Sequence, residues 1–313
     1  MLAHSIDMCS SSCGVTNITK YTHMPHEVRI YVAERIAKKD VALMNVDRNL
    51  TEEVKAYAEQ LGADLVGIAS SDRFTPPYPE GHRPQDIIPN AKSAVVFIIR
   101  NLCAGLTCNW EKMMKDTRMI PKPAQKMARN SLYQASGYVT LIQELMHIGH
   151  RLAIYLTDKG YDSFNIPPSY DDWKAIWHGQ VDLTCGGIYP AGEAWHPFPH
   201  AIAGFLAGLG DLGKSHLLLT PQFGPRHRIA SVVTVAPLEP DPVIEKRLCP
   251  DSCIICIEKC PTNALRNELY EVSYNGRTMK FARYDKSRCL KLGMENPGCG
   301  GQCGIVCPVK KKY

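Results

Sequence analysis

Eight of the thirteen cysteines fall in two runs in the last quarter of the chain, and each run ends on Cys-Pro. The first run is Cys249, Cys253, Cys256 and Cys260, and the second is Cys289, Cys299, Cys303 and Cys307. Thiolates are the usual ligands of cluster iron, and a short loop lets three of them converge on one cluster while the fourth comes from elsewhere. The spacing therefore predicts two [4Fe–4S] clusters.

The two runs resemble those of a bacterial ferredoxin, in which the fourth cysteine of each run ligates the cluster of the other run. That pattern assigns one cluster to Cys249, Cys253, Cys256 and Cys307. It assigns the second to Cys260, Cys289, Cys299 and Cys303. One gap in each run is a residue longer than usual. The alternatives are two structural zinc sites or a disulfide framework, and the paired Cys-Pro endings favour clusters over both.

Length and composition describe an ordinary globular protein. The chain has 313 residues, 45% hydrophobic and 21% charged, with a formal charge of +5 to which Lys310, Lys311 and Lys312 contribute. No basic stripe indicates a nucleic-acid partner, and no apolar stretch is long enough for a membrane span. The first residues lack the form of an export signal. We therefore expect a cytoplasmic protein whose remaining cysteines are free thiols.

An α/β body is expected to position the cysteines. A helix should begin at Asn49, which fits a capping box with Glu52, and stop at Gly62. Buried strands are predicted at 63–69, 94–99 and 229–236, and further helices at 130–159 and 201–208. Residues 166–199 are rich in Pro, Trp and His and should form a long functional loop. Residues 237–242 should link the body to the cysteine region.

A glycine-rich stretch at 208–215, GLGDLGKS, matches the P-loop expression, and its first six residues match the dinucleotide-binding expression. A P-loop has to follow a buried strand and open a long helix. Here an alanine-rich helical run precedes the stretch, and Pro221 would interrupt any helix after it. We therefore expect no nucleotide site.

The same stretch opens a longer resemblance. It is followed by LLLTPQFGPRHR at 217–228, VVTVAPL at 232–238 and then the double cysteine motif, and LGADLVGIA at 61–69 precedes it. This order resembles the cobalamin-dependent reductases, namely the reductive dehalogenases and epoxyqueuosine reductases. The resemblance implies an N-terminal extension over 1–48, a nitroreductase-like cobalamin-binding α/β domain over 49–242, and a small bacterial-ferredoxin-like domain over 243–313.

The resemblance also implies a function. A low-potential donor such as ferredoxin or flavodoxin would supply electrons, which would pass through two [4Fe–4S] clusters to cobalamin and then to a small organic substrate. The predicted corrinoid contacts are His200, Gly208, Gly210, Gly213, Gly224 and Arg226. Each glycine could instead serve a tight turn, and a histidine beside a proline could be structural.

The residue that delivers the proton departs from the pattern of both branches. The dehalogenase tyrosine would fall at Ile142, with Tyr138 one turn earlier on the same helix face. The epoxyqueuosine reductase aspartate would fall at Ala194, beside Glu193. We predict Tyr138 as the acid, Lys214 as its electrostatic partner and Glu193 as the second candidate. Tyr138 could instead be a core tyrosine, and Lys214 a surface or phosphate contact.

The motifs at 223–226 and 236–238 resemble the dehalogenases better, so the predicted function is a reductive dehalogenase-like reductase. Its substrate need be neither an organohalide nor queuosine. Two alternatives stay open: a non-catalytic iron–sulfur electron carrier, and an epoxyqueuosine reductase-like enzyme of tRNA modification.

Overall fold

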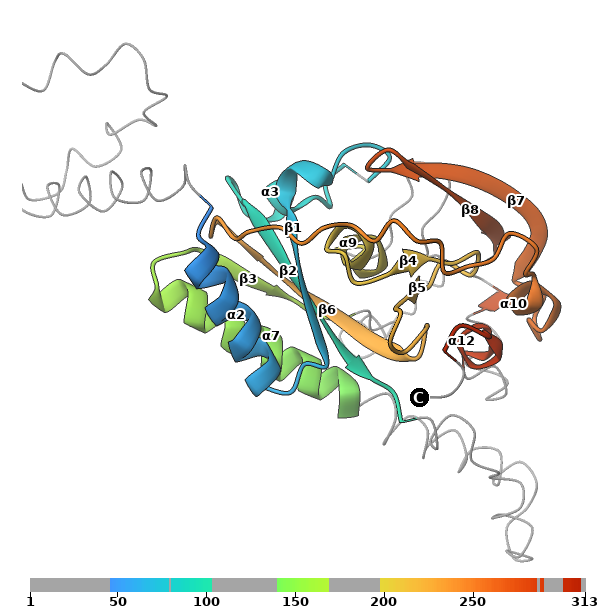
Figure 1. Ribbon diagram of the computed structural model, residues 1–313, viewed down its shortest axis with the longest axis horizontal. Helices are drawn as coiled ribbons and strands as arrows, with labels where there is room; N and C mark the ends of the chain where they lie inside the picture. The colour runs from blue at the N-terminus through green and yellow to red at the C-terminus, as the bar shows by residue number, and fades with distance from the viewer. Residues whose placement is uncertain are drawn as a thin grey trace, which may run out of the picture. The chain divides into compact units, whose positions relative to one another are not determined.

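A four-stranded antiparallel sheet is the centre of the fold (Figure 1). The computed structural model describes residues 46–78, 80–102, 140–168, 198–285, 288–289 and 301–310. The strands, in their spatial order, are β1 (Leu65–Ser70), β2 (Ser93–Arg100), β6 (His227–Thr234) and β3 (Ser163–Ile166). The predicted α/β class is confirmed, as are the three predicted strands to within two residues at each end.

The central strands are apolar on both faces because both faces are covered. In β2 every residue except Arg100 is buried, and Phe97 lies opposite Ala230 of β6. Side chains alternate between the faces of a strand, so a strand between two layers reads as a continuous apolar run. Strand β3 was missed, since it has only four residues and one of them, Phe164, is exposed.

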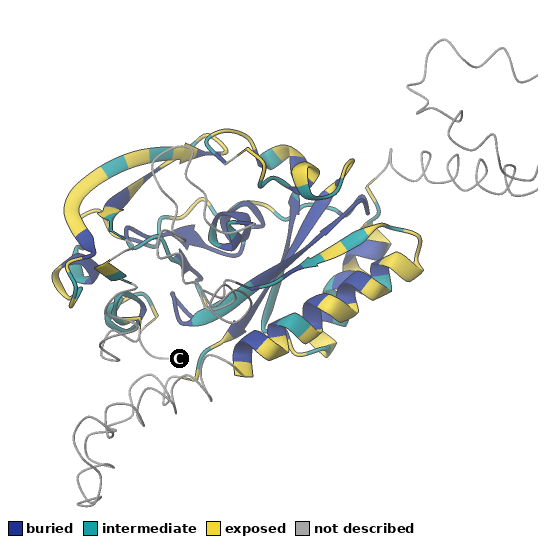
Figure 2. Cartoon of the chain, turned by 180° about the vertical axis from the view of Figure 1, so that it is seen from behind, coloured by how far each residue is buried: buried dark blue, intermediate teal, exposed yellow. Residues whose placement is uncertain are grey.

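Helices α2 (Arg48–Gln60) and α7 (Thr140–Asp158) cover one face of the sheet. Figure 2 shows the buried side of α7 turned to the strands and its exposed residues turned away. The predicted apolar stripe is buried as expected, at Leu141, Leu145, Ile148, Leu152 and Leu156. The part of the predicted helix before Thr140 lies outside the described residues.

The predicted N-cap of α2 is wrong by two positions. The side chain of Asp47, not of Asn49, accepts a hydrogen bond of 2.9 Å from the N–H of Leu50. Asp47 has the extended backbone of a cap residue, so its carboxylate reaches the free N–H groups of the first turn. Gly62 follows the helix with φ of 110°, as predicted for its end.

The other face of the sheet carries α9 (His200–Leu206) and a small sheet of β4 (Asp211–Leu212) and β5 (Leu218–Leu219). The expected helix at 201–208 is therefore confirmed, and the stretch GLGDLGKS forms β4 and a turn. No helix follows that turn, since Leu218 begins β5. The rejection of a P-loop is borne out by this context.

A two-stranded hairpin, β7 (Leu265–Tyr274) and β8 (Arg277–Tyr284), was missed from the sequence. Its turn residues, Asn275 and Gly276, have φ of 49° and 75°, the backbone of a type I′ turn. His216 fastens it to the body, stacking on Phe281 and contacting the carbonyl of Ala282 at 2.7 Å. Burial lowers the pKa of His216 to about 4, so this contact involves a neutral ring at neutral pH.

Short helices complete the described structure. They are η2 (Ser71–Arg73), α3 (Pro84–Ile87), α10 (Ile255–Glu258) and α12 (Gln302–Val306). Helices α10 and α12 lie in contact, and each stands at the end of one cysteine run. None of the described helices combines the length and the apolar character needed to cross a bilayer.

Candidate functional site

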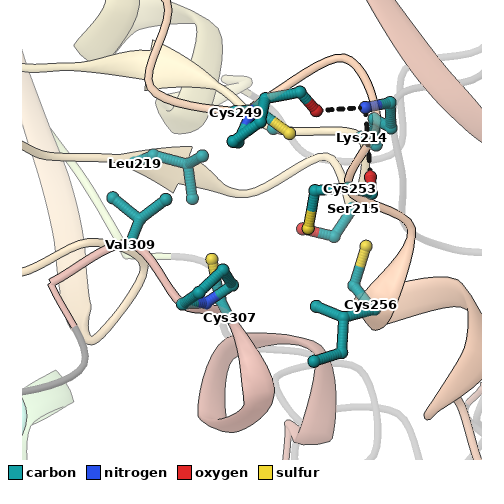
Figure 3. A pocket seen from close by; sticks show the side chains of 12 residues that line it. Lys214, Ser215, Leu219, Cys249, Cys253, Cys256, Cys307 and Val309 are labelled. Atoms are coloured by element: carbon teal, nitrogen blue, oxygen red, sulfur yellow. Dashed lines mark hydrogen bonds between the residues drawn. The ribbon is translucent and has the colours of Figure 1, made fainter.

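Four cysteines from two distant segments line one pocket, which contains about 330 Å³ of space that is partly open to solvent. They are the four assigned to one cluster, Cys249, Cys253, Cys256 and Cys307. Figure 3 shows their sulfur atoms turned towards a common space. Cys256 belongs to α10 and Cys307 directly follows α12, so the packing of these two helices brings the segments together.

The pocket disfavours bare thiolates. Burial, and after it the nearby thiols of Cys249, Cys253 and Cys307, raise the pKa of Cys256 to about 11. Burial likewise raises the pKa of Cys307. A set of buried thiols ionises readily only where a group of positive charge replaces the protons. The donor set therefore fits a metal centre with thiolate ligands, such as an iron cluster. Among the described residues no group of three or more His, Cys, Asp or Glu is arranged as it stands to hold a metal ion.

The second predicted ligand set is described in part. Cys260 and Cys303 are half-buried and pack on the same small core, which includes Leu265 and Ala282. Cys289 is also half-buried, and Cys299 lies outside the described residues.

Cys260 has the surroundings of a ligand thiolate. Its partial burial acts to raise its pKa, but hydrogen bonds from the N–H groups of Leu265, Thr262 and Ala264 and from the Thr262 hydroxyl outweigh that effect, and the pKa is lowered. Amides aimed at a ligand sulfur are a usual support of bound clusters.

Lys214 lies at the wall of the first pocket. Its side chain is buried, with 1% of the residue exposed, and Nζ donates to the carbonyls of Pro250, Asp251 and Cys253 at 2.6, 2.9 and 3.1 Å. Figure 3 draws the bonds to Pro250 and Cys253. An ammonium has three N–H donors, so all three are used on the first cysteine loop. The pairing of Lys214 with Tyr138 stays a prediction, because Tyr138 lies outside the described residues.

Arg226, predicted to contact the corrinoid, contacts the second cysteine segment in the described structure. One guanidinium nitrogen donates to the carbonyls of Gly304 and Cys307 at 3.0 and 3.2 Å. The other donates to those of Val309, at 2.7 Å, and Lys310. Arg226 is 4% exposed, and its Nε is buried without a hydrogen-bond partner. Its predicted contact with a corrinoid stays a prediction.

A buried acid was missed by the sequence reasoning. Asp211 is fully buried, and its Oδ2 accepts from the N–H groups of Leu248, at 2.8 Å, and Cys249, at 3.4 Å. Its Oδ1 lies 3.4 Å from a guanidinium nitrogen of both Arg247 and Arg277, which makes two ion pairs without well-shaped hydrogen bonds. Asp211 therefore fixes the start of the cysteine loop. An acid inside an apolar, glycine-rich stretch was its only sequence signal.

The glycines predicted to face a corrinoid lie against protein atoms. A Cβ at Gly208 would overlap the carbonyl of Pro242, one at Gly210 that of Leu219, and one at Gly213 would contact the Leu219 side chain. Gly224 has φ of 59°, and its Cβ would overlap the carbonyl oxygen of Val309. In the described structure these positions serve close approaches of the backbone.

Gly224→Ala is expected to destabilise the protein by about 2 kcal/mol or more, because a crowded contact adds to a left-handed backbone. Denaturant unfolding measures the effect. Gly276→Ala is the matched control, since its φ is 75° but no atom lies within 4 Å of the added carbon. It should cost only about 1 kcal/mol. Equal losses in the two variants would contradict the close approach of Gly224 to the cysteine segment.

His200 is also held by the protein. It is 2% exposed, with Nδ1 2.9 Å from the hydroxyl of Ser231 and Nε2 2.8 Å from the carbonyl of Pro167. The carbonyl can only accept, so Nε2 carries the proton and the hydroxyl donates to Nδ1. His200 here joins α9 to the sheet. Its predicted role beside a corrinoid stays a prediction.

The predicted proton donors are not part of the described structure. Tyr138 and Glu193 both lie outside it, as does most of the expected functional loop. Ile142, which occupies the aligned position of the dehalogenase tyrosine, is 4% exposed on α7.

Comparison with known proteins gives relatives of two kinds. The chain is 26% identical over 296 residues to the epoxyqueuosine reductase of Bacillus subtilis (strain 168), a match that covers 86% of this chain and 65% of that protein. It is 35% identical over 117 residues to the tetrachloroethene reductive dehalogenase of Dehalobacter restrictus, covering 34% of this chain and 21% of that protein. No protein-family model matches.

A solved catabolic reductive dehalogenase has a similar structure, with a TM-score of 0.56 and 20% identity over 87% of this chain and 33% of that one. This likeness shows a shared fold. The chain spans less than two thirds of the length of each of these three relatives.

Proposed function

Because the chain is homologous to epoxyqueuosine reductases and reductive dehalogenases, we propose that it is an oxidoreductase that depends on cobalamin and iron–sulfur clusters. One observation carries the iron–sulfur part: thiols from two distant segments line a single pocket in the grouping that the sequence pattern assigns to one cluster. The cobalamin part rests on the relatives. When bound, the clusters deliver electrons and cobalamin supplies the reducing centre for the substrate.

In this proposal the described core over 49–242 is a nitroreductase-like cobalamin-binding domain, and residues 243–313 are a ferredoxin-like domain. The first cluster would be held by Cys249, Cys253, Cys256 and Cys307. The second would be held by Cys260, Cys289, Cys299 and Cys303. The first site adjoins the body of the protein directly, because Gly213, Lys214 and Ser215 form part of its wall. An electron could therefore leave it towards the α/β core.

For the substrate, the relatives favour the epoxyqueuosine branch over the dehalogenase branch that the motifs suggested. The match to epoxyqueuosine reductase extends over 86% of the chain, against 34% for the dehalogenase. We therefore propose reduction of an epoxyqueuosine-type epoxide as the first activity to test, and reductive dehalogenation as the second.

Anaerobic reconstitution with cobalamin is expected to give about one cobalt per chain, as for a single tightly held cofactor. The loaded protein should then consume an epoxyqueuosine-containing RNA stem–loop, or an aryl halide, when supplied with a low-potential reductant. Cobalt content and product formation are the two measurements. A protein that binds iron but no cobalt would overturn the enzyme proposal in favour of an electron carrier. A protein that binds cobalt and only dehalogenates would make the aryl halide, and not the epoxide, the first candidate substrate.

A further inference from the structure

Two buried cations of the α/β body hold the two segments that form the four-cysteine pocket. Lys214 binds three carbonyls of the loop that carries Cys249 and Cys253, and Arg226 binds four carbonyls of the segment that carries Cys307. Both residues come from the short stretch that also contains β4 and β5. One rigid unit thus fixes both halves of the pocket.

Carbonyl groups solvate these two cations without cancelling their net charge. Within the described residues, no carboxylate forms an ion pair with Lys214 or Arg226, and the buried Asp211 is paired with Arg247 and Arg277 instead. Two positive charges beside the pocket therefore keep most of their electrostatic effect, since buried charges are weakly screened. Water screens the two charges little, because Lys214 and Arg226 are only 1% and 4% exposed.

We infer that Lys214 and Arg226 are paired positioning residues that set the spacing of the first cluster's ligand segments and raise that cluster's reduction potential. The inference rests on the proposed iron–sulfur function. Reduction adds an electron to a cluster that four thiolates already make anionic, so a nearby positive charge favours the reduced form. Hydrogen bonds to the carbonyls of both segments would hold the thiols at the spacing that the cluster needs.

The test is a potentiometric EPR titration of the full-length, iron-loaded protein. Lys214→Met and Arg226→Met should each lower the potential of one cluster by about 59 mV or more, which is a tenfold loss in the one-electron equilibrium constant. Cys307→Ala identifies that cluster. Lys214→Arg keeps the positive charge. Its cluster should therefore have a reduction potential close to that of the wild type, even where less iron is bound. If Lys214 were purely structural, its variants would differ in iron content, but Lys214→Met and Lys214→Arg would have the same reduction potential.

Lys159→Met is the matched control. It also removes a lysine charge, but from the turn directly after α7 on the opposite side of the sheet, where Nζ pairs with Glu53 at 2.7 Å. Its potentials should equal those of the wild type. Unshifted potentials in both Met variants would overturn the inference, whereas a wild type that binds no iron would overturn the proposed function instead.

Amide hydrogen exchange distinguishes the effect of Lys214 on its segment from the effect of Arg226 on the other. It can be measured even where a variant binds little iron. Lys214→Met should speed exchange in residues 248–256, and Arg226→Met in residues 301–310, each with little change in the other segment. If a Met variant does not fold, the charge-conserving Lys214→Arg and Arg226→Lys are compared in the same way. If every folded variant changed the exchange rates of both segments by the same amount, the assignment of one cation to each segment would be wrong.

Discussion

Replacing Cys307 by alanine is expected to abolish reductive turnover and to halve the iron content, from about eight atoms per chain to about four. Cys307 lines the pocket of Cys249, Cys253 and Cys256, so its loss should empty that site although its neighbours in sequence belong to the other ligand set. Anaerobic iron and acid-labile sulfide analysis measures the loss, and EPR identifies the cluster that remains.

Cys260→Ala is the reciprocal variant. Cys260 ends the first cysteine run but packs, like Cys303, on the small core that contains Cys256, Leu265 and Ala282. It should remove the other cluster and leave the EPR signal that Cys307→Ala removes. Loss of the same signal in both variants would contradict the crossed ligand sets, and two zinc atoms per chain in the wild type would contradict clusters altogether.

Tyr138→Phe is expected to lower turnover by about 10²-fold or more with iron and cobalt contents unchanged, the range for losing a general acid. The change removes only a hydroxyl, so cofactor binding should survive. Single-turnover kinetics with a reduced, loaded protein measures the effect on the chemical step. Glu193→Gln, which removes the acid of the second candidate at equal size, is the comparison.

Unchanged turnover in Tyr138→Phe together with a large loss in Glu193→Gln would assign the proton to the second candidate. A lysine beside a phenol lowers its pKa by favouring the phenolate. Lys214 uses its three donors on carbonyls in the described structure, so its predicted effect on Tyr138 would come from its charge and not from a hydrogen bond.

Much of the fold was predictable because its signals are local. The strands were visible as apolar runs since both faces of the sheet are covered, and the stripe of α7 was visible at helical spacing. The cap of α2 was misplaced because Asn49 and Asp47 are both good cap residues and only the backbone decides between them. The hairpin was missed although Asn275-Gly276 is the usual dipeptide of a type I′ turn.

The site was predictable only where residue type carries the chemistry. The grouping of Cys307 with the first run followed from the resemblance of the two runs to those of a bacterial ferredoxin. The contacts of Asp211, Lys214 and Arg226 could not be predicted from residue type, because their partners are backbone groups, which every residue has. Those partners also lie far away along the chain. A motif that resembles a phosphate-binding loop therefore proved to be a site of contact with the cysteine loop.

The order of the pocket's ligands has a consequence for biogenesis. Three of its thiols precede the β7–β8 hairpin and the fourth follows it, so the pocket is complete only when the segments on both sides of the hairpin meet. Binding of a cluster across these two segments would therefore contribute directly to folding. In a cell short of iron, the protein would lose this stabilisation, and more of its chains would be unfolded and open to proteases. The amount of the protein, rather than only its activity, should therefore follow the supply of iron.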